Sequence, residues 1–219
     1  MICIITHVQH IKNKNHYYGY GPYIREMNIW LNHVDEVILV APLIEDELNP
    51  IYEKYNHSNL HFYQVQEFTI SSLSNIFKTL IRLPKVFFQV YKAMAQSDHI
   101  HLRCPGNIGL IGAIVQILFP NKQKTAKYAG NWDPKSKQPW SYRLQKWILS
   151  NTFLTKNMQV LVYGEWEGSS KNVKSFFTAT YSELEVQNSK FKIQDSRFAE
   201  PFRFIFVGTL SKGKQPLYA

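Results

Sequence analysis

Residues 19–42 read GYGPYIREMNIWLNHVDEVILVAP, a glycine-containing loop followed by a helical stretch and an apolar run of strand length. Pro22 suits the first turn of a helix, where its missing N–H costs nothing. Apolar residues recur at helical spacing on one stripe, namely Tyr23, Met27, Trp30 and Leu31. The run 37–41 is continuously apolar, as is typical of strands covered on both faces. The stretch therefore predicts a helix packed on a parallel sheet.

The same alternation of strand and helix continues along the chain. Further apolar runs of strand length occur at 2–6, 60–65, 99–102, 125–129, 159–163 and 204–207. Helix-period segments separate most of them, and strand–helix–strand units of this kind form right-handed parallel crossovers. The sequence thus predicts the α/β class, with a doubly wound, mostly parallel, Rossmann-like sheet.

Two of the predicted helical segments have distinctive features. Residues 106–119, GNIGLIGAIVQILF, are small and apolar nearly all round, which predicts the most deeply buried helix. Residues 70–97 read as two helices broken at Pro84, because proline removes a donor and disfavours helix at the preceding residue. Basic side chains interleave with the apolar ones there, and they form either a solvated face or a surface that rests on an anionic membrane: Lys78, Arg82, Lys85 and Lys92.

Bulk composition limits the classes of function. The 219 residues are 45% hydrophobic and carry a net charge of +9, which favours a polyanionic partner. The lysines are scattered and no nucleic-acid motif is present, so nucleic acid is not expected. The eight histidines and two cysteines lack metal-ligand spacing, so we expect no metal, and Cys3 and Cys104 are predicted as buried thiols. With neither a signal peptide nor the roughly 18 apolar residues of a spanning helix, the chain is expected to be cytoplasmic.

Ligands of open parallel sheets bind beyond the carboxyl ends of the strands, so the loops there hold the candidate site residues. Residues 7–23 are expected to form a long loop in which Gly21 approaches a ligand and Tyr20 stacks on a sugar ring. An ordinary loop without ligand contact is the alternative.

The loops after the next strands add further candidates. Arg103 places a charge at the carboxyl edge after the run 99–102. After the run 125–129 come Asn131, Trp132 and Asp133, which suit hydroxyl recognition and ring stacking. The equally open alternative is an Asx-type turn before Pro134 with a tryptophan in the core.

The last residues, 202–219, read FRFIFVGTLSKGKQPLYA, again a strand, a glycine loop with lysines and a helix start. They follow the polar stretch 182–201, which has the composition of a connector. We therefore expect an N-terminal domain with linker at 1–200, and at 201–219 the start of a second domain that is cut short.

These residues resemble the group 1 (family 4) retaining glycosyltransferases of the two-Rossmann-domain, or GT-B, architecture. VGTLSKGK is similar to the opening of that family's second domain, and GYGPYIREMNIWLNHVDEVILVAP to the opening of its first. The resemblance implies that Gly21 approaches the donor diphosphate. It also implies that a second group of residues holds the donor from the other side: Gly208, Thr209 and Lys214, with Lys212 as the alternative to Lys214. A histidine common in the family after the fifth strand is replaced here by the stretch 130–132, and the catalytic residues are unknown.

The resemblance implies transfer of a sugar from a nucleotide-diphosphate donor to an acceptor hydroxyl with retention, incomplete in this chain. The acceptor, a glycan or lipid-linked precursor, would lie over Tyr20, Arg103 and the stretch 131–133. The nucleotide sugar is the substrate and no cofactor is expected, and contact with the inner face of an anionic membrane is a further expectation. Two alternatives stay open, a nucleotide-sugar 2-epimerase of the same fold and a non-catalytic Rossmann-like binding module.

Overall fold

The computed structural model describes residues 1–66, 73–177, 184 and 187, with the side chains of 73–81 left out. Residues up to 177 belong to one unit, Met1–Thr180. The predicted strand at 204–207 and most of the predicted linker lie outside the described residues, as does the expected start of a second domain at 201–219.

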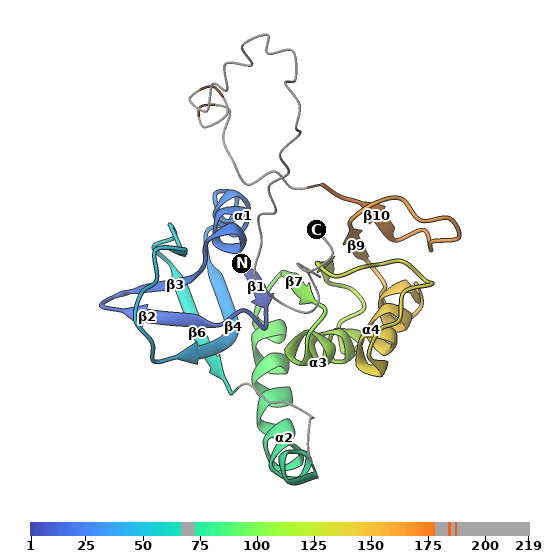
Figure 1. Cartoon of the computed structure of the whole chain (residues 1–219), viewed down its shortest axis with the longest axis horizontal. Helices are drawn as coiled ribbons and strands as arrows, with labels where there is room; N and C mark the ends of the chain where they lie inside the picture. Colours follow the sequence, from blue (N-terminus) through green and yellow to red (C-terminus); the bar gives the residue numbers. More distant parts are fainter. Residues whose placement is uncertain (67–72, 178–183, 185–186, 188–219) are drawn as a thin grey trace, which may run out of the picture. The chain divides into compact units, whose positions relative to one another are not determined.

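The described part of the chain is an α/β fold built on one mixed, mostly parallel sheet of ten strands (Figure 1). The strand order is β10-β9-β8-β7-β1-β4-β2-β3-β5, and β6 pairs with β4. Pairing is parallel along β10-β9-β8-β7-β1-β4-β6 and antiparallel where β3 meets β2 and β5. The strands are β1 (Ile2–Ile5), β2 (His10–Asn13), β3 (His16–Tyr20), β4 (Val37–Ile44), β5 (Tyr52–Lys54), β6 (Leu60–Val65), β7 (His99–Cys104), β8 (Gln123–Tyr128), β9 (Met158–Val162) and β10 (Val173–Ser175).

Helices lie on both faces of the sheet. The α-helices are α1 (Gly21–Leu31), α2 (Leu73–Gln96), α3 (Asn107–Val115) and α4 (Trp140–Ser150), and a 3₁₀ turn, η1 (Gln116–Leu118), continues α3. Figure 1 shows α1 on one side of the sheet and α2, α3 and α4 on the other. Side chains alternate along β1, so that Ile2 and Ile4 enter the core under α1 while Cys3 and Ile5 enter the core under the other helices.

The apolar runs predicted the central strands correctly. Six of the seven predicted runs coincide with β1, β4, β6, β7, β8 and β9. All four residues of β1 are buried, as are the first six of β4, because helices or loops cover both faces there. The predicted α/β class and the mostly parallel sheet are therefore confirmed.

The segment 7–23 was predicted as a long loop, and this prediction is wrong. It contains the antiparallel hairpin β2–β3, whose strand β2 continues the sheet beside the carboxyl end of β4. Lys14 turns the chain at the hairpin tip with a positive φ of 53°. Burial of Ile11 and His10 stabilises the hairpin, although the exposed residues 12–16 at its tip give the sequence a loop-like composition.

The predicted break at Pro84 is also wrong, because α2 runs without interruption from Leu73 to Gln96 with Pro84 inside it. Proline removes one helical hydrogen bond. That loss is offset by packing after the proline, where Val86, Val90 and Met94 are buried in the core. Among the described residues, no helix is long and apolar enough to cross a membrane.

Candidate functional site

The order in which the chain adds strands to the sheet reverses between β1 and β7. From β1 the chain builds β4 and β6 on one side, and α2 then returns it to β7 on the other. Open α/β sheets bind ligands beyond the carboxyl ends of the strands at such a point. His7 follows β1 here, and Gly106 follows β7. A Cβ atom at Gly106 would lie 2.7 Å from His7 Nδ1, so glycine is required for this close approach.

Gly106 is also the residue from which α3 begins. Its N–H donates to Gln145 Oε1 of α4 at 3.3 Å, and its carbonyl accepts the first helical hydrogen bond, from Leu110 N at 2.8 Å. The N-terminus of a helix carries partial positive charge and attracts anions. The amino end of α3 therefore adds positive potential at the carboxyl edge, next to His7.

A buried ion cluster lies at the same edge, on the face covered by α1. Lys127 Nζ donates to both carboxylate oxygens of Glu26, each at 2.7 Å, and Arg103 Nη1 lies 3.6 Å from Glu26 Oε2. Arg103 and Lys127 are partners in the β7–β8 register, so both side chains leave the sheet on one face. The exposed fractions of the side chains are only 2% for Lys127, 5% for Glu26 and 15% for Arg103. Counted over the described residues, one carboxylate faces two cations, which gives the cluster an excess positive charge.

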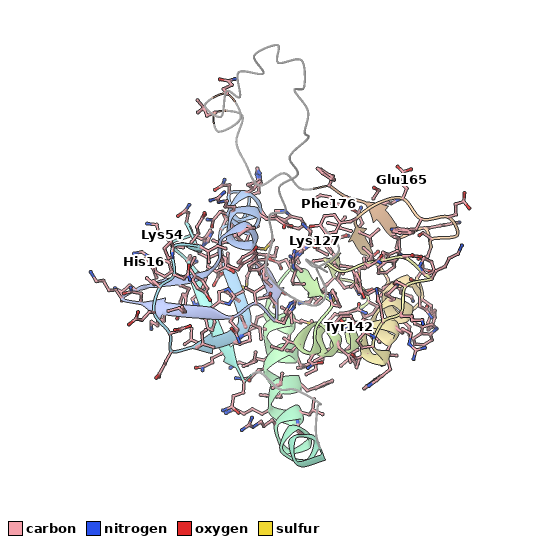
Figure 2. The ribbon with its side chains drawn as sticks, viewed as in Figure 1. His16, Lys54, Lys127, Tyr142, Glu165 and Phe176 are labelled. Atoms are coloured by element: carbon pink, nitrogen blue, oxygen red, sulfur yellow. The ribbon has the colours of Figure 1, made fainter. Side chains whose placement is uncertain are left out.

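Aromatic rings enclose both cations. The Arg103 guanidinium lies 5.3 Å from the ring centroid of Tyr23. Lys127 Nζ lies 5.3 Å from the ring of Tyr163 and 5.2 Å from the ring of Phe176, which Figure 2 labels close to Lys127. Burial raises the pKa of the Tyr23 phenol, so this ring stays neutral beside Arg103. The rings hold the cations in place and leave their charge intact.

Two histidines lie behind the cluster on the same face of the sheet. His101 Nδ1 and His99 Nε2 both meet Thr125 Oγ1, at 2.8 and 3.0 Å. Burial lowers the pKa of His101 to about 3, with Arg103, His99 and Lys127 adding to the shift. His101 is therefore neutral near pH 7, and the excess charge belongs to Arg103 and Lys127.

Arg103 is the predicted site residue that the structure places inside this cluster. The loop after β8 approaches the same edge, because a Cβ atom at Gly130 would lie 3.1 Å from Pro105, which follows β7. Asn131 and Asp133 belong to that loop. Asn131 Oδ1 accepts from Asp133 N at 2.9 Å, and Asp133 Oδ1 accepts from Lys135 N at 2.8 Å. Both side chains thus form the Asx turns that were the alternative prediction.

Trp132 lies in the core. Its ring is 4% exposed and packs edge-on against Tyr128, with centroids 5.0 Å apart. Lys146 Nζ lies 5.4 Å from the Trp132 ring and donates to the Trp132 carbonyl at 2.8 Å. The structure therefore supports the core alternative for this tryptophan and gives its ring no surface for stacking on a sugar.

Tyr20 ends β3, which β1, β4 and β2 separate from β7 in the sheet, and Gly21 is the first residue of α1. The N–H of Gly21 donates to the carbonyl of Ile51 at 2.9 Å, and a Cβ atom there would lie 2.5 Å from that oxygen. Gly21 thus serves the packing of α1 on the chain before β5, while the Tyr20 side chain is 49% exposed. The other predicted donor residues lie outside the described residues: Gly208, Thr209, Lys212 and Lys214.

Sequence reasoning missed Glu26, Lys127 and His7, although two signals pointed to the ion pair. Lys127 interrupts an apolar run that was predicted to be covered on both faces, and a buried lysine needs a partner of opposite charge. Glu26 falls on the same stripe as Tyr23 and Met27, three positions after the tyrosine. Only the fold, however, could show that these positions meet 101 residues apart.

No protein-family model, curated protein or solved structure matches the chain. The chemistry of the site is therefore argued from its own residues.

Proposed function

We propose that the chain is the acceptor-side, Rossmann-like part of a retaining GT-B glycosyltransferase, and that its carboxyl-edge cluster binds a phosphate group of the substrates. The observation that carries the proposal is that two cations, Arg103 and Lys127, meet one carboxylate, that of Glu26, within the part of the chain that the structure describes. This charge lies at the edge where open α/β sheets bind their ligands, together with the N-terminus of α3.

Each group has a role in this proposal. Arg103 presents a planar set of donors that suits phosphate oxygens, and its buried Nη1 has no hydrogen-bond partner among the described residues. Glu26 positions Lys127 by binding it through both oxygens. Sugar transfer from a nucleotide diphosphate needs stabilisation of the leaving diphosphate, for which fixed cations are well suited. The asparagine and aspartate of the loop after β8 would face the acceptor hydroxyl.

The resemblance of VGTLSKGK assigns the remaining donor contacts to Gly208, Thr209 and Lys214, with Lys212 as the alternative. Gly21 is left out of the proposed diphosphate contacts, since its N–H already donates to Ile51.

Isothermal titration of the purified chain with pyrophosphate tests the phosphate site. We expect Arg103→Gln to weaken binding about tenfold to a hundredfold, because a charge-assisted hydrogen bond contributes roughly 1.5 to 3 kcal/mol. The matched control is Arg25→Gln, an arginine on the exposed side of α1 that pairs with Glu53. Equal affinities of wild type and Arg103→Gln for pyrophosphate would refute the site.

Two further results would replace the proposed activity by its alternatives. Tight binding of a nucleotide by this chain alone would favour a non-catalytic binding module. Incubation of the chain with nucleotide sugars and no acceptor, followed by product analysis, would reveal a 2-epimerase as an inverted sugar configuration.

A further inference from the structure

The outer side of the helical layer formed by α2, α3 and α4 displays large apolar side chains to solvent. On the described residues of this layer and the turn that follows α4, Phe88 is 65% exposed, Leu118 56%, Trp140 58%, Trp147 60% and Phe153 76%. Single exposed apolar residues are ordinary, but several gathered on one layer mark a contact surface. We call this surface the helical face.

Helix α4 shows the pattern most clearly. Its inner side buries Gln145, Ile148 and Leu149. The opposite side carries exposed Trp140, Arg143 and Trp147, which share a stripe because they lie three and four positions apart. Packing of α4 on the rest of the fold explains why its inner side is buried. It does not explain why two tryptophans are exposed on the opposite side.

The same pairing of aromatic and basic groups recurs beside α4 and on α2. After α4, Lys156 Nζ lies 5.4 Å from the ring of the exposed Phe153. On α2, exposed Lys85 and Lys92 flank Phe88 at three positions before and four after it. Tryptophan and phenylalanine next to lysine and arginine are the composition of surfaces that lie in a membrane interface.

Charge along the chain is segregated in the same way. Residues 68–164, which include all three helices, hold 13 of the 25 lysines and arginines and only two of the 16 acidic residues. Of these two, Asp98 binds the ammonium group of Met1 at 2.9 Å, and Asp133 is engaged in its turn. Arg103 and Lys127 belong to the buried cluster on the opposite face of the sheet. The exposed basic side chains that remain on the helical layer complement an anionic surface, among them Lys85, Lys92, Arg143 and Lys156.

An apolar cavity of about 400 Å³ lies between α2 and α3 in this layer. Its lining is Leu83, Pro84, Phe87, Ile111 and Ile114, all of them apolar. Phe87 and Ile114 are about two-fifths exposed, which places the cavity at the surface of the layer. Hydrocarbon chains suit such a lining, and no polar group in it would lose a hydrogen bond.

We propose that the helical face docks on a membrane that contains anionic lipid, with Trp140, Trp147 and Phe153 in the interface. Arg143, Lys85 and Lys92 contact the headgroups. The sequence alone pointed only to basic residues of α2, whereas the structure adds the tryptophan stripe of α4. This inference does not depend on the proposed glycosyl transfer, since it concerns a different surface and a different ligand.

Co-sedimentation of the purified chain with vesicles tests the docking. We expect binding to phosphatidylcholine vesicles that contain phosphatidylglycerol, and much weaker binding to phosphatidylcholine alone. Each basic residue near an anionic surface contributes about a fivefold gain in partitioning, so Lys85→Ser/Arg143→Ser should bind on the order of 25-fold less. The control Ile29→Ser/Leu48→Ser removes two exposed apolar residues outside the helical face and should bind as wild type does.

Brominated lipids show which surface enters the bilayer. They should quench part of the wild-type tryptophan fluorescence, and Trp140→Phe/Trp147→Phe should still bind but lose that quenching. Trp140→Ser/Trp147→Ser, verified as folded by circular dichroism, should lose binding. The proposal is overturned if the wild-type chain does not bind anionic vesicles or if quenching survives in the phenylalanine variant. It is also overturned if light scattering shows a wild-type dimer that Trp140→Ser/Trp147→Ser converts to a monomer.

Discussion

Replacement of Glu26 by glutamine gives the sharpest test of the buried ion cluster. The change keeps the shape of the side chain and removes the carboxylate that pairs with Lys127 and Arg103. Lys127 is 2% exposed, so its charge would stay in a low-dielectric site after losing the Glu26 carboxylate. Breaking a buried pair in this way costs about 3–5 kcal/mol, a large share of the roughly 5–15 kcal/mol by which domains are stable.

A double-mutant cycle isolates the interaction. Lys127→Met removes the cation at nearly constant volume, and Glu26→Gln/Lys127→Met removes both charges together. Because replacing both partners avoids the unpaired charge, we expect the double variant to be more stable than the sum of the single changes predicts, by about 2 kcal/mol or more. Urea denaturation followed by circular dichroism gives each free energy of unfolding.

The neighbouring pair Arg25–Glu53 is the matched control. It joins α1 to β5 at 2.5 Å, but its side chains are 46% and 34% exposed. Water screens such a pair, so Glu53→Gln should change the free energy of unfolding by less than about 1 kcal/mol. If Glu26→Gln costs no more than Glu53→Gln, the cluster is not desolvated and the reasoning about its excess charge fails.

Three further predictions follow from buried or crowded positions. Burial lowers the pKa of His101 to about 3, below its unfolded value near 6.5, so the unfolded state binds more protons between these pH values. Wild type should thus lose about 2 kcal/mol of stability at pH 5 that His101→Gln does not lose, as urea titrations at pH 7 and pH 5 would show. Gly106→Ala should destabilise by about 1–3 kcal/mol because its Cβ would meet His7 at 2.7 Å, and His7→Ala in the same chain should recover most of that in thermal melts. Pro84→Ala should raise the free energy of unfolding by about 1 kcal/mol or more, since α2 regains a helical hydrogen bond; an unchanged denaturation midpoint would contradict this.

The sequence predicted those parts of the fold that depend on burial of both faces of a strand. The runs at β1 and β4 are continuously apolar because helices or loops cover them on each side. The hairpin β2–β3 was not predicted, because its stability depends on the burial of Ile11 and His10. The exposed polar residues at its tip give the segment the composition of a loop. The strands β5 and β10 have three residues each, which is too short to show the alternation of apolar and polar side chains that predicts a strand.

Topology alone predicts where some of the candidate residues lie. Arg103 was selected because it stands near the carboxyl end of a parallel strand, and it lies in the cluster there. Trp132 stands in an equivalent loop, yet its ring packs on Tyr128, and no local pattern tells these two outcomes apart. Glu26 and Lys127 meet only in the folded chain. A single sequence can indicate that a buried lysine needs an acidic partner, but it cannot show which residue that partner is.

The long separation of that ion pair also bears on the order of events during synthesis. Glu26 leaves the ribosome 101 residues before Lys127, so α1 exists well before the strand that neutralises its carboxylate. Docking α1 on β1 and β4 in that interval would place an unpaired carboxylate in an apolar environment, which is strongly unfavourable. We therefore expect α1, although it precedes the other described helices along the chain, to settle on the sheet only after β7 and β8 have paired.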